Sequence, residues 1–345
     1  MRSCVIHAAK DLRIETQPDP VIGAGGVVVR VRAGGICGSD LHYFQDGRIG
    51  DFVIREPFVP GHEFCGEVVE TGAAVTRVKA GDRVAIHPGR ACGRCAYCRE
   101  GQPNLCQAIY FMGSASRFPH MQGGFREMVA VEEEQCYPIT ADIPFGEIAF
   151  AEPLSVALHA GQRAGNLVGK RVLVSGAGPI GQLVLLAARR AGCGHVTVTD
   201  ILDHPLAIAQ AGGADAVVNV AAGDAGVAAA GAAIGGFDVA FEVSGFPAAL
   251  NTVIEAVRPG ATIVLVGSPP AGLSPVLANR IMTRELTLRG AFRFGHEFAD
   301  AVSCLQSRRI DVRPLLSRTV PMTEAVAAFA AARDRAHNIK VIVAF

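Results

Sequence analysis

Residues 170–181 read Lys-Arg-Val-Leu-Val-Ser-Gly-Ala-Gly-Pro-Ile-Gly, an apolar run that passes directly into a glycine-rich turn. The unbroken run predicts a strand buried on both faces, as in a parallel sheet. Residues 182–191 predict an apolar, alanine-rich helix, and residues 195–199 predict a second strand that ends at Asp200. A G-x-G-x-x-G turn between strand and helix, with an acidic residue after the next strand, indicates a dinucleotide-binding fold.

The turn also indicates how a dinucleotide would bind. Glycines permit the tight turn and the close approach of a pyrophosphate, whose charge meets the amide groups at the helix N-terminus. The residues expected at this contact are Gly176, Gly178, Pro179, Ile180 and Gly181. Asp200 would accept hydrogen bonds from the adenosine ribose, and its charge would repel a 2′-phosphate, which favours NAD over NADP.

Strands continue to alternate with helices after Asp200. Residues 216–220, 237–243, 262–267 and 285–290 predict further strands, which indicates an α/β fold with a doubly wound sheet. Ligands bind at the carboxyl ends of strands in such sheets. The remaining cofactor contacts are therefore expected at Val243, Val266, Gly267, Ser268, Ala291 and Phe292.

The flanking regions predict a second domain. Before residue 139 the chain shows short strands at 27–32, 66–72 and 81–86 with glycine at the turns, which indicates a compact, barrel-like β fold. Residues 319–332 predict a final helix, and residues 340–345 predict a strand that returns to this β-rich part. We expect a β-rich domain of residues 1–147 and 292–345 and a cofactor domain of residues 148–291.

Four cysteines form a tight cluster inside the β-rich part. Two residues separate Cys92 from Cys95 and Cys95 from Cys98, and seven precede Cys106. Four thiolates can close a tetrahedral zinc site with no open position, which is a structural site. An iron–sulfur cluster and two adjacent disulfides are the alternatives.

A second set of metal-ligand types stands earlier in the chain. Residues 34–43 read Gly-Gly-Ile-Cys-Gly-Ser-Asp-Leu-His-Tyr, and residues 59–63 read Val-Pro-Gly-His-Glu. Cys37 and His62 are expected zinc ligands, with Glu63 or the distant Glu152 as a third. Three protein ligands with one open position would make a catalytic site. The alternative for each residue alone is a buried thiol or a hydrogen-bonded turn histidine.

Composition excludes several classes of function. The formal net charge is zero, so a general binder of nucleic acid or anionic membranes is not expected. The first ten residues lack the pattern of a signal peptide, and no apolar stretch is long enough to span a bilayer. Ten cysteines in such a chain indicate metal sites or free thiols, so we expect a cytoplasmic protein.

Together these motifs resemble the zinc-dependent medium-chain alcohol dehydrogenases, in their polyol dehydrogenase branch. The resemblance covers essentially the whole chain and includes residues 151–155, Ala-Glu-Pro-Leu-Ser. It implies a GroES-like catalytic domain beside a Rossmann domain, one catalytic and one structural zinc, NAD, and a homo-oligomer that is a dimer or tetramer. In this branch the catalytic zinc is described with residues matching Cys37, His62, Glu63 and Glu152.

The resemblance also implies the chemistry. A secondary alcohol is expected to be oxidised at zinc with hydride transfer to NAD, while Ser39 relays the proton. Tyr43 and Arg293 match positions that contact polyols, and Glu152 is a further substrate neighbour. Residues 111–120, 237–245 and 288–294 favour a sugar acid such as L-idonate, whose carboxylate could be bound by Arg293, Arg117 or His120. A neutral polyol, sorbitol or xylitol, is the alternative substrate, and surface exposure is the alternative for Arg117 and His120.

Overall fold

The computed structural model describes residues 1–345, and the chain forms two compact units. The first consists of Met1–Glu152, Phe298–Asp334 and Lys340–Phe345, and the second consists of Pro153–Glu297 and Arg335–Ile339. The second unit thus begins at Pro153 instead of 148 and ends at Glu297 instead of 291. It also takes in a short segment near the C-terminus that the sequence pattern does not predict.

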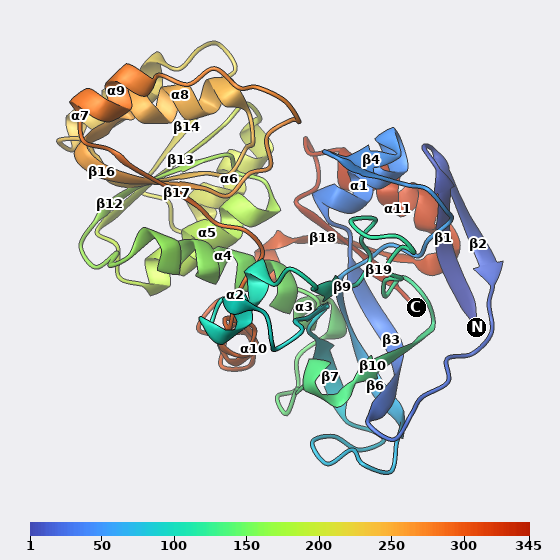
Figure 1. Cartoon of the computed structure of the whole chain (residues 1–345). Helices are drawn as coiled ribbons and strands as arrows, with labels where there is room; N and C mark the ends of the chain where they lie inside the picture. Colours follow the sequence, from blue (N-terminus) through green and yellow to red (C-terminus); the bar gives the residue numbers. More distant parts are fainter. The chain divides into compact units, whose positions relative to one another are not determined.

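The first unit is built around a mainly antiparallel sheet. Its strand order is β11-β7-β6-β3-β19-β18, and β10 also pairs with β3 (Figure 1). The strands are β3 (Gly26–Gly35), β6 (Glu63–Thr71), β7 (Arg83–Ile86), β10 (Met128–Glu132), β11 (Cys136–Pro138), β18 (Leu316–Pro321) and β19 (Lys340–Ala344). Val27, Val29 and Val31 are buried at alternate positions of β3 and share a core with Phe64 and Val84. Burying each such side chain contributes about 2 kcal/mol.

Short elements surround this sheet. The hairpin of β1 (Arg2–Ala8) and β2 (Asp11–Thr16) packs its apolar residues in a second core with helix α1 (Gly38–Asp46). The remaining elements of the unit are β4 (Arg48–Ile49), β5 (Phe52–Val53), β8 (Gly89–Arg90), β9 (Tyr110–Phe111), α2 (Ala96–Arg99), α3 (Phe145–Ile148), α10 (Phe298–Gln306), α11 (Ala325–Arg333) and the 3₁₀ turns at Pro103–Leu105, Glu133–Gln135, Arg313–Leu315 and Met322–Glu324.

The helix predicted for residues 319–332 begins later than expected. Thr319 and Val320 belong to β18, which runs parallel to β19, and α11 starts only at Ala325. Pro321 ends the strand, since its ring and missing N–H fit neither a helix interior nor a continued ladder. The helix prediction was therefore wrong for residues 319–321, and residues 322–324 form a 3₁₀ turn.

The second unit contains a parallel sheet of order β14-β13-β12-β15-β16-β17. The strands are β12 (Arg171–Ser175), β13 (His195–Asp200), β14 (Ala216–Asn219), β15 (Phe237–Glu242), β16 (Val257–Leu265) and β17 (Thr287–Gly290). The helices are α4 (Ala151–Ala164), which starts in the first unit, α5 (Pro179–Arg190), α6 (Asp203–Ala211), α7 (Ala225–Ala233), α8 (Pro247–Ala256) and α9 (Ala278–Thr283).

Helices cover both faces of this sheet, with α7 and α8 on one side and α4 and α5 on the other (Figure 1). Val172, Leu173 and Val174 of β12 are fully buried, as expected for a central strand covered on both faces. The strand order reverses between β12 and β15, which is where such sheets bind ligands. No helix of the chain is both long enough and apolar enough to cross a lipid bilayer.

Candidate functional site

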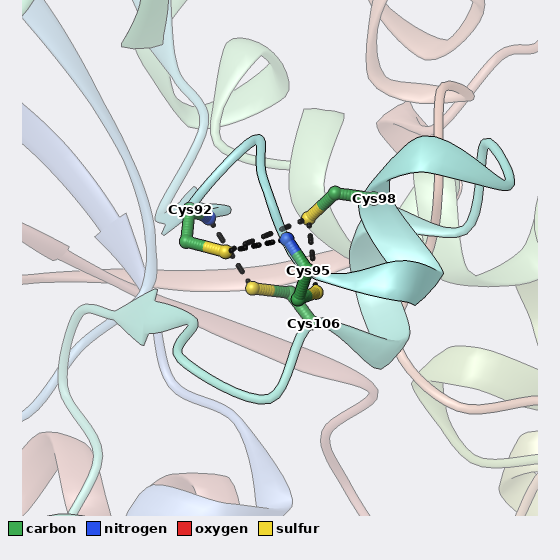
Figure 2. Close-up of side chains that lie close together, drawn as sticks. All are labelled: Cys92, Cys95, Cys98 and Cys106. Carbon is green, nitrogen blue, oxygen red and sulfur yellow. Dashed lines mark hydrogen bonds between the residues drawn. The ribbon is translucent and has the colours of Figure 1, made fainter.

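Four cysteine thiols converge in the segment that follows β8. The sulfur atoms of Cys92, Cys95, Cys98 and Cys106 all lie within 4.8 Å of one another (Figure 2). The Sγ atoms of Cys95 and Cys98 are 3.5 Å apart, and those of Cys92 and Cys98 are 4.0 Å apart. A disulfide bond is about 2.05 Å long, and all four thiols are free. The alternative of two disulfides is therefore wrong for this structure.

Backbone amides surround these sulfurs. The N–H of Cys92 donates to the sulfur of Cys106 at 3.2 Å, and the N–H of Cys95 donates to that of Cys92 at 3.4 Å. Hydrogen bonds from the amides of Cys98 and Gln107 lower the pKa of Cys95 to about 6. Such donors stabilise thiolates, which are the form that binds metal. The arrangement fits a zinc ion held on all sides, as in structural zinc sites.

A second group of ligand atoms combines a thiol, an imidazole and a carboxylate. Cys37 caps the N-terminus of α1, His62 directly precedes β6, and Glu63 is its first residue. Their ligand atoms lie within 4.8 Å of one another, and His62 and Glu63 are buried. Strand pairing creates the group, since Gly35 of β3 lies opposite Glu63 and the chain reaches Cys37 immediately afterwards.

Asp40 holds the backbone next to this group in place by hydrogen bonds. It is fully buried, and its carboxylate accepts the N–H of Cys37 at 3.0 Å and the N–H of Gly61 at 3.1 Å. The same carboxylate lies 4.0 Å from Nδ1 of His62. Asp40 therefore fixes the backbone on both sides of the group and faces the ring that would bind metal. Its position three residues after the helix cap is the sequence signal that could have revealed it.

Lys340 is a neighbour of the group that sequence reasoning missed. Its buried ammonium forms an ion pair with Glu63 and donates a hydrogen bond to the carbonyl oxygen of Ile36 at 3.0 Å. Burial by itself would lower the pKa of Lys340, but Glu63 and Cys37 raise it more. A side chain at Gly35 would overlap Glu63, so glycine is required for this close approach.

Glu152 lies beside the group without being part of its mutual contacts. It stands in the first turn of α4 and is buried. Burial raises the pKa of Glu152 to about 8, His62 opposes this shift, and Glu63 and Cys37 add to it. Only Glu63 supplies a carboxylate oxygen within 4.8 Å of both Cys37 and His62. In this structure Glu63 is thus the carboxylate of the group, and Glu152 is a buried neighbour whose neutral form is favoured.

The chemistry of the donors fits a metal ion. Burial and the nearby Glu63 raise the pKa of Cys37 to about 12, so a thiolate at this position needs a cation to stabilise it. Oε2 of Glu63 is buried and has no hydrogen-bond partner besides its ion pair with Lys340. Thiolate, imidazole and carboxylate are the ligand types of zinc, and three of them are typical of a catalytic site.

Two expected contact residues near this group have different surroundings. Ser39 lies in the first turn of α1 and is partly exposed. Tyr43 is buried, its hydroxyl accepts the N–H of Ala115 at 3.1 Å, and its ring meets Phe58 edge to face. Ser39 remains accessible, whereas the phenol of Tyr43 is engaged inside the first unit.

The candidates for a substrate carboxylate also differ. Arg117 is exposed, as the surface alternative states, but that alternative is wrong for His120, which is buried. Nδ1 of His120 donates to the carbonyl oxygen of Arg117 at 2.7 Å, and Nε2 accepts the N–H of Arg55 at 2.8 Å. The backbone therefore uses both ring nitrogens. In the second unit, Arg293 is half-buried and stacks over Phe292.

The glycine-rich turn forms as a strand–turn–helix unit in the second unit. β12 ends at Ser175 and α5 begins at Pro179, with Gly178 at the helix cap. A side chain at Gly181 would overlap the carbonyl oxygen of Gly176, so glycine is required where the helix packs on the turn. Gly176, Ile180 and the other residues of the fingerprint therefore have the geometry that brings a pyrophosphate to a helix N-terminus.

Asp200 lies at the end of β13 and is buried. Its Oδ2 accepts the N–H of Ala177 at 2.8 Å, and its Oδ1 accepts the N–H of Ile201 at 2.8 Å and that of Leu202 at 3.2 Å. Oδ2 also pairs with Arg335 at 2.9 Å. The carboxylate expected at the ribose is thus tied to the turn and carries a cationic partner from the C-terminal segment.

The other expected cofactor residues follow three neighbouring strands. The N–H of Val243 donates to the carbonyl oxygen of Ser175 at 2.8 Å, and that of Ala291 donates to Leu265 at 2.9 Å. These bonds hold the strand ends together at one edge of the sheet. The residues placed there are Val243, Val266, Gly267, Ser268, Ala291 and Phe292.

Comparison with known proteins agrees with this arrangement. Residues 23–141 match the family described as alcohol dehydrogenase GroES-like domain, and residues 179–307 match that described as zinc-binding dehydrogenase. An L-idonate 5-dehydrogenase (NAD(P)(+)) of Escherichia coli K12 is 40% identical over 344 residues, which cover 100% of this chain and 98% of that protein. A sorbitol dehydrogenase of Gallus gallus is 38% identical over 98% of this chain and 95% of its own.

Solved structures agree as well. The crystal structure of L-idonate 5-dehydrogenase from Escherichia coli K-12 has a TM-score of 0.94 and 39% identity, covering 100% of this chain and 98% of that one. That of a 2R,3R-butanediol dehydrogenase from Bacillus subtilis has a TM-score of 0.89 and 30% identity, covering 100% and 99%. The α/β architecture of a GroES-like and a Rossmann unit is thereby confirmed.

Proposed function

This chain belongs to the zinc-dependent medium-chain alcohol dehydrogenase family, and we propose that it oxidises L-idonate, a sugar acid, to 5-ketogluconate with hydride transfer to NAD. The observation that carries the proposal is the group of Cys37, His62 and Glu63, whose ligand atoms lie within 4.8 Å of one another and of which His62 and Glu63 are buried. Three protein ligands of mixed type match a catalytic zinc that keeps one position for substrate.

The residues around the group have defined tasks in this reaction. Bound zinc would supply Lewis-acid polarisation of the alcohol oxygen. Bound NAD would accept the hydride that leaves the carbinol carbon. The hydroxyl proton leaves through Ser39, whose side chain is partly exposed, and Glu152, whose pKa burial raises to about 8, assists as a neighbouring group that exchanges a proton near neutral pH. Loss of one hydride and one proton converts the secondary alcohol to a ketone.

The two substrate classes differ by one charge. A sugar acid carries a carboxylate, for which Arg293 and Arg117 have guanidinium groups that allow bidentate contact. His120 is a weaker candidate, because the backbone occupies both of its ring nitrogens. A neutral polyol such as sorbitol is the second candidate function, since the sorbitol dehydrogenase of Gallus gallus is 38% identical to this chain.

The setting of the reaction is also part of the proposal. All ten cysteines are free thiols, which suits the reducing conditions of the cytoplasm. The partners are the small substrate and further copies of this chain in a dimer or tetramer. Light scattering on the purified protein would measure the number of copies.

Initial rates of NADH formation test the proposal. The zinc-loaded protein would be given L-idonate and sorbitol at equal concentrations. We expect a higher kcat/KM for L-idonate. Arg117→Gln should lower it while leaving the rate with sorbitol unchanged, and Arg293→Gln should lower it more than it lowers kcat/KM for sorbitol. Higher kcat/KM for sorbitol would contradict the sugar acid and support the neutral polyol. Activity with neither alcohol would contradict both.

A further inference from the structure

The first unit also contains a cavity that the proposed reaction does not use. Its volume is about 320 Å³, which is enough for a small molecule. Strand β10 forms one wall, where Val131 and Glu132 pair with Val27 and Gly26 of β3, and the paired strands β8 and β9 form another. No residue that lines the cavity belongs to either metal-ligand group or to the glycine-rich turn.

Arg126 brings into this cavity a positive charge that no carboxylate of the chain pairs with. The side chain is half-buried, and its Nε donates to the carbonyl oxygen of Gly123 at 2.8 Å, while the two Nη groups make no hydrogen bond within the chain. Burial lowers the pKa of Arg126, and Tyr110 opposes this shift. Because a guanidinium stays protonated in proteins, this charge is partly removed from water without a counter-ion.

Arg90 supplies a second guanidinium to the same cavity. It forms an ion pair with Glu132 at 2.8 Å, and its guanidinium carbon lies 5.6 Å from the ring centre of Tyr110. The side chains of Arg90 and Glu132 are 53% and 44% exposed. An ion pair this exposed contributes little to stability, so Arg90 can turn toward another anion at small cost.

We propose that this cavity is a binding site for a small molecule with a carboxylate or phosphate group, which Arg126 holds through its two Nη groups. The planar fork of a guanidinium matches either group. Arg90 turns from Glu132 to the same anion, and Met112 and Val131, which belong to the core of the sheet, contact the apolar part of the ligand. The inference goes beyond the proposed function and depends on neither zinc, dinucleotide nor alcohol.

Calorimetric titration of the zinc-loaded protein with inorganic phosphate and with succinate tests this proposal. At least one probe should bind wild type with a Kd of about 1 mM or below, and the tighter of the two identifies the anionic group of the ligand. Arg126→Gln should raise this Kd at least about tenfold, because a charge-assisted contact is lost. Glu132→Gln should lower it about twofold or more, because it removes the competing carboxylate and releases Arg90. Arg318→Gln is the control, since it removes an exposed charge of β18 that does not line the cavity.

The same titrations can overturn the proposal. Failure of both probes to bind wild type in this range would do so. A smaller increase in Arg126→Gln, or an equal increase in Arg318→Gln, would place the anion elsewhere and would also overturn it. Circular dichroism and Tm without probe show whether Arg126→Gln is folded. If it is not, Glu132→Gln decides, and an unchanged or higher Kd in this variant would overturn the proposal in either case.

Discussion

The two metal-ligand groups of the first unit are built in opposite ways. The four cysteines come from one short segment, are only partly buried except for Cys106, and are surrounded by backbone N–H donors. Cys37 comes from one segment and His62 and Glu63 from another, and the ammonium of Lys340 balances the charge of Glu63. The first arrangement would surround a bound metal with four thiolates, whereas the second, with three ligands, would leave one coordination position open for substrate. The difference predicts that one group serves folding and the other serves catalysis.

Cys37, His62 and Glu63 are called the mixed group below. Removing a ligand from this group should have the largest effect of all the substitutions, and the property that it lowers should be activity. Cys37→Ser replaces a thiolate by a poor zinc ligand. We expect kcat for alcohol oxidation to fall at least about 10³-fold, because several kcal/mol of charge stabilisation is lost. Steady-state NADH formation measures this loss. Cys193→Ser, at another buried free thiol, is the control and should retain its rate. Retained activity in Cys37→Ser would contradict the catalytic role of this group.

Removing a ligand from the cysteine group should reduce stability instead. Cys98→Ser leaves three thiolates, and the segment around it has little apolar core of its own. We expect one zinc equivalent fewer and a loss of several kcal/mol in the free energy of unfolding. Metal analysis and thermal unfolding measure the two effects, and the rate per folded molecule should stay within about tenfold of wild type. A selective loss of rate with unchanged Tm would contradict the structural role.

The charge balance of the mixed group gives a third prediction. Lys340→Met leaves Glu63 buried without its cation, and we expect the metal-free protein to lose about 3 kcal/mol. Urea unfolding of the apoprotein measures this loss, and bound zinc should reduce it. Arg32→Met is the control, because its ion pair with Glu67 is partly exposed and contributes at most about 1 kcal/mol. Equal losses in the free energy of unfolding would show that the buried ion pair of Lys340 and Glu63 contributes no more stability than the partly exposed pair of Arg32 and Glu67.

The smallest effect is expected at His87, where β7 leads toward the cysteine segment. Burial lowers the pKa of His87 from 6.5 to about 4, and its ring packs against Phe298. As the pH falls below 6.5, His87 becomes protonated in the unfolded chain but stays neutral in the folded chain. The free energy of unfolding therefore decreases until about pH 4. We expect a loss of about 2 kcal/mol over this range.

Urea unfolding as a function of pH measures the contribution of His87. His87→Gln should unfold with a shallower pH dependence between 6.5 and 4 than wild type. An identical pH dependence in both proteins would mean that His87 binds a proton as readily in the folded chain as in the unfolded chain, which would contradict its lowered pKa.

The sequence alone was sufficient to predict a site when all residues of the site lie within one short segment. The spacing from Cys92 to Cys106 and the turn from Gly176 to Gly181 lie within single segments, so their partners could be read directly. The strand at residues 27–32 was equally clear, because alternate valines bury one face. The predicted fold class followed from these local patterns and is confirmed.

Long-range contacts could not be predicted in the same way. Lys340 donates to Ile36 across 304 residues, and Arg335 reaches Asp200 across 135. Neither lysine nor arginine near a C-terminus carries a local signal for burial or pairing. His120 shows the converse, since its sequence looks like a surface loop while the backbone engages both ring nitrogens. Only the completed strand pairing of β3, β6 and β19 brings Glu63 and Lys340 together.

Stepwise removal of zinc tests the contrast between the two groups most directly. Zinc content, NADH formation and Tm would be measured on the same samples during titration with a chelator. The mixed group has three ligands and should release its metal before the four thiolates do. We predict that activity disappears with the first zinc equivalent while Tm stays high, and that Tm falls only with the second. Activity that survives loss of the first equivalent, or a Tm that falls with it, would contradict the separation of catalytic and structural sites.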